Sequence, residues 1–514
     1  SVETGRVVFA RDPDVLLNPA SNVKLFTSAA ALARLGPEYR FETEFWVDGK
    51  STRRPSAAPT LYVRGKGDPT IVTERLWSMA GELARAGVGK VGDIVLDDGF
   101  FDGERVGPGY DQESGDRAYL APTGALSLNF NAVEVRVGPG DRIRAKGRVD
   151  VEPASDFFVV QNRTVTVGAR KRRHVVPESQ PADGRQRLVV SGTVPVGSRP
   201  QTLWRRIDDP PRYFGHTLKK LLAMHGVKVT GRIRLGGVPA DARLVHVAQS
   251  EPLSEVVRRL NKSSNNFIAE QILKTLGAEA KGAPGTWAKG ILATEEVLAE
   301  LGLPRGSYLM RNGSGLNDAN RFSARQTVTL LRAMWGRFPL MAEFLGSLPV
   351  AGRDGTIRRR FGDSDAAGRL RAKTGTLENV VSLAGFVETA AGEPLAFAVF
   401  ANDYPTRAAA IRQAVDALGG AIAASGGTPG ELDRAVARAT PGAAQPVLAS
   451  ATDVSTAART YYALARAEDR RNVRALRTAL ATEADPVLRL AIAEGVYLSD
   501  PDGDASQALF LEAA

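Results

Sequence analysis

The sequence predicts a mixed α/β protein of the α+β type, in which one domain is interrupted by a large β-rich insert and followed by an α-helical extension. Three observations lead to this prediction. The 514 residues are too many for one hydrophobic core and suggest about three or four domains. Short strand-like segments separated by Gly, Pro and Asp turns dominate residues 59–245. Beyond residue 430 the composition shifts to Ala, Arg, Leu and Glu, which is typical of helices.

The first part of the interrupted domain is expected over residues 1–58. Residues Arg6–Ala10 have a strand-like pattern. A helix should begin near Ser21, and its mostly apolar residues predict that it is buried. Gly36-Pro37 ends this helix, and residues 39–47 then alternate as in a strand.

The insert at residues 59–245 should form one or two small domains. Its predicted elements are strands at Leu61–Arg64, Gly92–Leu96, Ala132–Val137 and Phe157–Val160, and helices at Glu74–Ala86 and Tyr213–His225. The basic run Arg170–Arg173 could bind an anionic wall polymer, but a solvated hairpin tip is the simpler interpretation.

The second part of the interrupted domain is expected over residues 246–425. Its predicted elements are helices at Leu253–Leu276, Thr286–Leu301, Ala324–Trp335 and Arg407–Ala424, and strands at Arg369–Ala372, Val380–Val387 and Leu395–Phe400. In the extension at residues 431–514, Val473–Ala481 and Pro486–Tyr497 resemble the paired helices of a HEAT-type repeat. This helical tail is a candidate surface for a protein partner.

The composition excludes several kinds of chemistry. Zero cysteines exclude disulfides, thiolate metal sites and cysteine nucleophiles. The hydrophobic share of 43% and charged share of 24% are those of an ordinary globular protein. The formal charge of +10 favours anionic surroundings such as nucleic acid, phospholipid heads or acidic wall polymer. No apolar run approaches the ~20 residues that span a membrane.

Three short motifs stand in a fixed order along the chain: Ser21-Asn22-Val23-Lys24, Ser264-Asn265-Asn266 and Lys373-Thr374-Gly375. Each alone is weak, because helix caps, polar loops and strand ends use the same residue types. Together they supply the parts of one reaction, nucleophilic acyl transfer by serine. The serines of the first and second motifs, Ser21 and Ser264, are 243 residues apart, from 264 − 21. This separation is why an inserted domain is expected between them.

The first motif offers a nucleophile and a base. Residues three apart on a helix share a face, so Lys24 can reach the hydroxyl of Ser21. A lysine acts as a base only if its pKa is lowered by desolvation or by a neighbouring cation. We expect the apolar helix to provide the first effect and Lys373 the second. The backbone N–H of a serine at a helix N-terminus can also face a developing oxyanion.

The second motif contains two registers, Ser263 with Asn265 and Ser264 with Asn266, and spacing does not choose between them. Its flanks predict a turn between two helices. A hydroxyl there can pass a proton toward a leaving amine, and a carboxamide can hold a substrate amide.

The third motif offers a cation in Lys373, a hydroxyl in Thr374 and, at Gly375, room for a second backbone to approach closely. If this segment is an edge strand, the N–H of Thr376 is available as a second oxyanion donor.

Longer stretches around the motifs resemble one known family. The chain resembles the class C low-molecular-mass penicillin-binding proteins, which are D-alanyl-D-alanine carboxypeptidases and endopeptidases, over about residues 1–425. The similar stretches are Leu17–Lys24, Gly67–Thr70, Gly92–Asp98, Ala125–Asn131, Asn261–Asn266, Gly313–Leu316 and Ala351–Thr356. The resemblance implies a β-lactamase/transpeptidase-like domain built from both parts of the interrupted unit, with the insert between them.

The resemblance also implies catalytic roles. Ser21 would be the acylated nucleophile and Lys24 its base. The register Ser264 and Asn266 is selected, for proton relay and substrate anchoring. Lys373 would assist electrostatically.

The resemblance also implies roles in substrate binding, and one position differs from the family pattern. Thr374 would bind the terminal carboxylate of the substrate, and the N–H groups of Ser21 and Thr376 would form the oxyanion hole. Asn312 precedes Gly313 where the family usually has Asp, which puts a nearby structural hydrogen bond in doubt but not the chemistry.

The resemblance implies a serine-type D-Ala-D-Ala carboxypeptidase that acts on peptidoglycan stem peptides and cross-links and binds β-lactams. No metal or organic cofactor, nucleic-acid partner or transmembrane segment is expected. Such an enzyme works in the periplasm or at the cell surface. The chain opens at Ser1 without an initiator Met or a signal peptide, so we expect a mature or trimmed form.

Two other functions are open to the same sequence. A β-lactamase needs a base that hydrolyses the acyl-enzyme quickly, but no E-x-x-L-N stretch lies near the second motif. A catalytically silent wall-binding scaffold would be free to lose Ser21, Lys24 and Lys373, and all three are present. The four histidines show neither metal-ligand spacing nor a G-x-S-x-G partner, which leaves a Ser-His-Asp hydrolase with little support.

Overall fold

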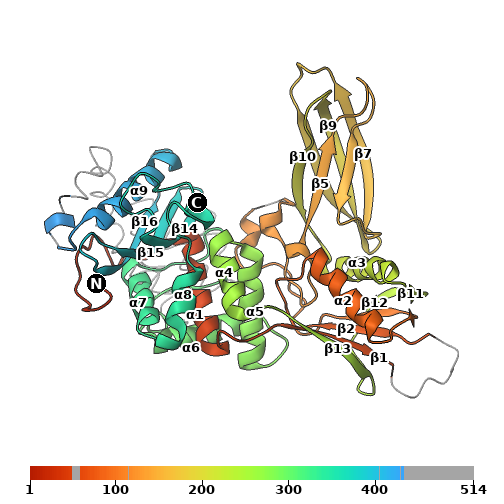
Figure 1. Ribbon diagram of the computed structural model, residues 1–514, viewed down its shortest axis with the longest axis horizontal. Coiled ribbons are helices and arrows are strands. Elements are labelled where there is room, and N and C mark those ends of the chain that lie inside the picture. The colour runs from red at the N-terminus through yellow and green to blue at the C-terminus, as the bar shows by residue number, and fades with distance from the viewer. Residues whose placement is uncertain (49–57, 114, 405, 429, 433, 435–514) are drawn as a thin grey trace, which may run out of the picture.

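The computed structural model describes residues 1–48, 58–113, 115–404, 406–428, 430–432 and 434. A body of helices and one sheet lies at one end of the molecule, and an insert of strands and two long helices extends from it (Figure 1). The expected helices at Val473–Ala481 and Pro486–Tyr497 lie outside the described residues.

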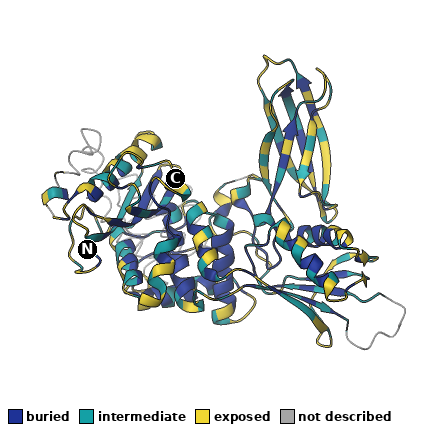
Figure 2. Ribbon diagram, viewed as in Figure 1, coloured by how far each residue is buried: buried dark blue, intermediate teal, exposed yellow. Residues whose placement is uncertain are grey.

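The helical half of the body is built around one buried helix. Its elements are η1 (Ala20–Asn22), α1 (Val23–Leu35), α4 (Leu253–Ser263), α5 (Asn266–Lys281), α6 (Trp287–Glu300), α7 (Ala324–Trp335) and α8 (Phe338–Ser347). Helix α1 contacts α4, α5, α6, α7 and α8, and its central residues are buried (Figure 2). Its apolar composition, together with Gly36 at a φ of +86° after its last turn, explains both the burial and the end of the helix.

The other half is a three-stranded antiparallel sheet in the order β14 (Leu370–Leu377), β15 (Val380–Glu388), β16 (Pro394–Asn402). Alternate residues of β15 enter two different cores, because successive side chains of a strand point to opposite faces. Ala384 and Phe386 join the cluster that contains α7, whereas Leu383 and Val387 join the cluster that contains α9 (Ala408–Ala424). Strand β14 is left at the sheet edge, where η1 packs against it.

The part of the insert next to the body contains a five-stranded sheet covered by two helices. The strand order is β12 (Ile233–Leu235), β4 (Ile94–Asp97), β2 (Leu61–Gly65), β1 (Glu42–Val47), β13 (Arg243–Gln249). Helices α2 (Thr73–Arg85) and α3 (Pro210–Met224) contact each other beside it, and a short parallel pair joins β3 (Lys90–Val91) to β11 (Lys228–Val229).

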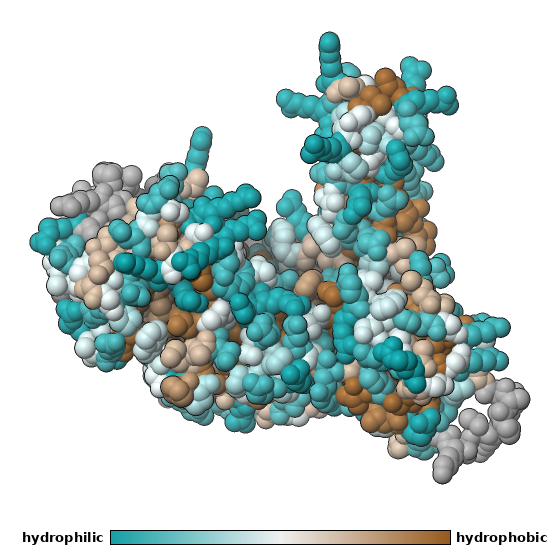
Figure 3. Space-filling view, in the orientation of Figure 1, coloured by the Kyte–Doolittle hydropathy of each residue, from teal (hydrophilic) through white to brown (hydrophobic). Residues whose placement is uncertain are grey.

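The far part of the insert is a strand-only lobe that projects from the rest (Figure 1). One sheet has the order β10 (Gln201–Arg206), β5 (Ala132–Gly138), β6 (Arg148–Glu152), and the other β7 (Phe158–Val167), β9 (Arg185–Pro195), β8 (His174–Ala182). Figure 3 shows an apolar patch at the free end of this lobe, where Ile143 and Val165 are exposed.

The structure corrects two of the expected elements. Residues Arg6–Ala10 are not a strand. Single contacts hold this segment instead, since Arg6 pairs with Glu393 at 3.2 Å and Val8 packs on the α9 cluster. The run Arg170–Arg173 is not a hairpin tip, because β7 and β8 do not pair with each other. It joins two strands that flank β9, and all but Arg173 are exposed.

Two further differences concern the helices. The predicted helical stretch Leu253–Leu276 breaks after Ser263, where the second motif forms the turn that its flanks indicated. Helix α8 was not predicted, since its Phe338-Pro339 start reads as a break rather than as a first helical turn.

Candidate active site

Side chains from all three motifs meet at one place. Lys24 Nζ lies 3.0 Å from Ser21 Oγ, 2.8 Å from Asn266 Oδ1 and 2.5 Å from the backbone oxygen of Ser314. Lys373 Nζ lies 2.7 Å from Ser264 Oγ. Residues up to 352 positions apart, from 373 − 21, thus form two neighbouring Lys–Ser pairs, since Lys373 lies close enough to Lys24 for their charges to repel.

Ser21 lies in the short 3-10 helix η1, one turn before α1, and does not cap α1 with its side chain. This turn is fastened from both sides. The Ala20 N–H donates to Asn18 Oδ1 at 2.9 Å, and Asn22 Nδ2 donates to Ser382 Oγ at 2.6 Å. Ser382 on β15 donates in turn to a backbone oxygen of the η1 segment. The serine is therefore held on a rigid turn that faces β14.

The second motif turns one register toward the site. Ser264 ends α4 in the left-handed conformation, with φ at +58°, and its hydroxyl faces Lys373. Ser263 instead donates to the Arg259 oxygen, and Asn265 caps α5 by accepting from a backbone N–H. Asn266 donates through Nδ2 to the backbone oxygen of Tyr119 at 3.3 Å, which directs its Oδ1 at Lys24.

The third motif lies on the edge strand β14. Lys373 also donates to the Thr374 oxygen at 2.7 Å, and the Thr374 hydroxyl donates to Thr356 Oγ1 at 2.9 Å. The N–H of Ala372 donates outward, away from β15. Because backbone groups alternate along a strand, the N–H of Thr376 also faces this open edge.

Gly375 lets β14 approach the serine turn. A Cβ at this position would lie 2.1 Å from Ser382 Oγ and 2.8 Å from the Pro19 oxygen, distances that no side chain tolerates. The absence of a side chain at Gly375 therefore sets the spacing between β14 and η1.

Burial controls the protonation of Lys24. Its side chain has no exposed surface, and burial lowers its pKa from 10.5 to about 7, against the opposing attraction of the Glu270 carboxylate. Burial, and secondly repulsion from Lys24, lowers the pKa of Lys373 well below its usual range. Desolvation, which the sequence predicted for Lys24, is therefore the main cause of its lowered pKa. The repulsion between the two amines lowers the pKa of Lys373 instead.

Glu270 is a site residue that sequence reasoning missed. Its carboxylate is buried and accepts from the N–H groups of Gly313 (3.1 Å) and Ser314 (2.8 Å) and from Trp287 Nε1 (2.8 Å). It thus holds the loop whose Ser314 oxygen contacts Lys24. Two signals could have revealed it: a lone carboxylate within the apolar stretch of α5, and its position four residues after Asn266, on the same helix face.

The loop that Glu270 holds also packs against η1, the turn that carries Ser21. Gly315 has φ at +73°, and a Cβ there would lie 1.9 Å from the Ala20 oxygen. Asn312 keeps this loop together, because its Oδ1 accepts from the Gly315 N–H at 2.8 Å and from Asn320 Nδ2 at 3.0 Å. Asn312 therefore makes structural hydrogen bonds at the position where the change from the family's Asp had put one in doubt.

The described residues contain no group of three or more His, Asp or Glu side chains placed to bind a metal ion. Within the same residues, no helix has the length and apolar character needed to cross a bilayer.

Comparison with known proteins gives a consistent answer. The model of the D-Ala-D-Ala carboxypeptidase 3 (S13) family matches residues 1–423. The chain is 37% identical over 419 residues to a D-alanyl-D-alanine carboxypeptidase of Actinomadura sp. strain R39, covering 78% of this chain and 76% of the relative. It is 25% identical over 413 residues to the D-alanyl-D-alanine carboxypeptidase DacB of Haemophilus influenzae, covering 79% and 85%.

A solved structure agrees with these matches. The crystal structure of penicillin binding protein 4 (dacB) from Haemophilus influenzae superposes with a TM-score of 0.70 at 25% identity, over 79% of this chain and 89% of that one. The same protein has also been solved in complex with a β-lactam, with a TM-score of 0.65.

Proposed function

This chain belongs to the D-Ala-D-Ala carboxypeptidase 3 (S13) family, and we propose that Ser21 is the nucleophile through which it works. The chain is a serine-type D-alanyl-D-alanine carboxypeptidase, and the proposal extends to the cleavage of peptidoglycan cross-links, in both cases through an acyl-enzyme on Ser21.

The observation that carries the proposal is the set of partners around Lys24 Nζ. Two of them, Asn266 Oδ1 and the Ser314 oxygen, can only accept a hydrogen bond, whereas the Ser21 hydroxyl can donate one. A neutral amine has two N–H groups and one lone pair. Lys24 Nζ is placed as the donor to Ser21 Oγ. In the neutral amine the two N–H groups can serve Asn266 and Ser314, which leaves the lone pair free to accept the proton of Ser21.

Acylation follows from this arrangement. Lys24 takes the proton of Ser21 while Oγ attacks the carbonyl carbon of the scissile D-Ala amide. The negative charge that develops on the carbonyl oxygen is stabilised by the N–H groups of Ser21 and Thr376. Asn266 anchors the amide of the bound peptide through Nδ2, whose hydrogen bond to the Tyr119 oxygen is exposed.

The leaving amine departs next to Ser264. The Ser264 hydroxyl, held by Lys373 at 2.7 Å, passes a proton to the amine as the C–N bond breaks. Thr374 binds the terminal carboxylate of the leaving residue. Water then attacks the ester on Ser21 and restores the free hydroxyl.

Three broader assignments accompany these roles. We propose that the substrates are peptidoglycan peptides, that β-lactams acylate the same serine, and that the enzyme acts outside the cytoplasm. Relatives named as carboxypeptidases and a related structure bound to a β-lactam support the first two statements.

We also propose a division into domains. The catalytic domain combines both ends of the described chain around α1 and β15, and the insert lies between them. Because β1 and β13 pair within the insert's five-stranded sheet, we place the insert at about residues 42–249 instead of 59–245.

Intact mass after incubation with a penicillin tests the function. We expect one stable adduct on Ser21, absent from Ser21→Ala, together with release of D-alanine from a peptide ending in D-Ala-D-Ala. Rapid loss of the adduct would identify a β-lactamase. The absence of any adduct or D-alanine release in a folded protein would identify a silent scaffold.

A further inference from the structure

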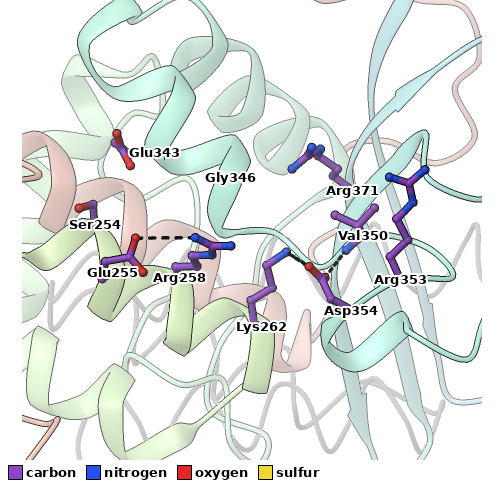
Figure 4. Close-up of a pocket in the computed structure, with 10 residues that line it drawn as sticks. All are labelled: Ser254, Glu255, Arg258, Lys262, Glu343, Gly346, Val350, Arg353, Asp354 and Arg371. Atoms are coloured by element: carbon purple, nitrogen blue, oxygen red, sulfur yellow. Dashed lines mark hydrogen bonds and ion pairs between the residues drawn. The ribbon is translucent and has the colours of Figure 1, made fainter. Parts of the chain in front are cut away.

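A charged hollow of about 360 Å³ lies beside the motifs, between α4, α8 and the start of β14 (Figure 4). Its charged lining residues are Arg258, Lys262, Arg353 and Arg371 on the cationic side, and Glu255, Glu343 and Asp354 on the anionic side. Nothing in the reaction proposed above uses this hollow.

The hollow retains an unbalanced positive charge. Lys262 pairs with Asp354 at 2.7 Å, and Arg258 pairs with Glu255 at 3.7 Å. The guanidinium of Arg371 has no ion-pair partner among the described residues, and it points toward the hollow from the side opposite α4 (Figure 4).

The cations in the hollow also repel one another. Burial lowers the pKa of Lys262, and the nearby Arg371 and Arg258 lower it further, against the attraction of Asp354. A bound anion would relieve this repulsion and give Arg371 the partner that it lacks.

The position of the hollow relates it to the leaving group. Arg371 precedes Lys373 by two residues on the same face of β14, which places it about 7 Å along the strand. Lys262 precedes Ser264 by two residues at the end of α4. Because Lys262 and Arg371 line the same hollow, the hollow lies on the Arg371 side of the Lys373–Ser264 pair, and Thr376 lies in the opposite direction along the strand.

We propose that this hollow binds a carboxylate of the leaving peptide when the enzyme cleaves a peptidoglycan cross-link. The inference rests on the proposed function, in which the leaving amine departs at Ser264. A single departing D-alanine is much smaller than the hollow and already has Thr374 for its carboxylate. The acceptor stem of a cross-link continues past the scissile bond and carries further carboxylates, which Arg371, supported by Arg258, can pair with.

The covalent step is ordinary amide hydrolysis. The bond between the D-Ala carbonyl carbon and the side-chain nitrogen of the acceptor stem breaks, and the bond from Ser21 Oγ to that carbon forms. The serine proton moves to Lys24, and a proton reaches the departing amine from Ser264. Water then converts the ester into a carboxylate and restores the serine.

The test compares two cross-linked dimers that differ only in the acceptor stem, one with free carboxylates and one with those carboxylates amidated. The measured quantity is the ratio of their kcat/KM values. We expect the native enzyme to favour the free dimer by about tenfold or more, the scale of one charged hydrogen bond. Arg371→Glu should bring the ratio to one or below. Arg412→Glu, an equal charge change at an exposed position of α9, should retain the native ratio.

The outcomes separate the two proposals. A native enzyme that forms the penicillin adduct yet cleaves both dimers equally overturns the role of the hollow, and so does an Arg371→Glu enzyme with the native ratio. A native enzyme that forms no adduct and releases no D-alanine would refute the proposed function itself. If Arg371→Glu does not fold, Arg258→Glu on the exposed side of α4 gives the same comparison, with the same expected loss of preference.

Discussion

Acylation of Ser21 should rise with pH through an inflection near 7, because Lys24 can take a proton only in its neutral form. The change of its pKa from 10.5 to about 7 corresponds to about 5 kcal/mol of preference for the neutral amine. At pH 7 about half of the Lys24 amines are then neutral, compared with about one in three thousand for an unperturbed lysine. Below the inflection the rate should fall about tenfold for each pH unit.

The assay is the second-order rate constant of penicillin acylation between pH 5 and 9, with Lys24→Arg as the decisive variant. A guanidinium keeps the positive charge but does not deprotonate in this range. We therefore expect a loss of at least ~100-fold, the usual scale for a general base, and a similar loss for Lys24→Ala. Lys220→Arg, at an exposed position of α3, serves as the matched control. A native rate that is flat from pH 5 to 9, or unchanged in Lys24→Arg, would refute the assignment.

Three further predictions concern neighbouring residues. Ser264→Ala should slow acylation by a peptide substrate at least tenfold, measured by D-alanine release, while Ser263→Ala should stay near the native rate; equal effects would mean that the register is wrong. Glu270→Gln removes the carboxylate that raises the pKa of Lys24, so the inflection in penicillin acylation should move to lower pH, and a move to higher pH would contradict the electrostatic account. Gly375→Ala places a methyl group 2.1 Å from a hydroxyl oxygen of β15, so it should lower the melting temperature and the acylation rate together, at a cost of about 1–3 kcal/mol; a native melting temperature would show that the strand can move aside.

The sequence predicted the parts of the site whose chemistry is local. Ser21 and Lys24 lie three residues apart, so helical geometry alone brings their side chains together. The resemblance to a family supplied the register of the second motif, which the structure shows turned toward Lys24 and Lys373. Spacing could not supply it, because the choice depends on the single left-handed residue that ends α4.

Other features were out of reach because they depend on contacts between distant segments. The prediction of a strand at Arg6–Ala10 was wrong, since a short alternating segment forms a strand only when a neighbouring strand edge pairs with it. The start of the insert is a second example: we propose residue 42 in place of 59 because β1 pairs with β13, about two hundred residues away. Local composition does not show whether a segment finds a strand to pair with.

Glu270 shows why the three motifs do not by themselves define the protonation of the site. Lys24 and Lys373 are both fully buried, and two buried cations repel each other strongly. The carboxylate of Glu270 offsets part of the effect of burial on Lys24 and holds the loop whose Ser314 oxygen contacts that lysine. Too little compensation would leave the base too weak to accept the serine proton, and too much would keep Lys24 protonated. The pKa of about 7 lies between these limits, and it is set by the burial and the carboxylate rather than by the lysine alone.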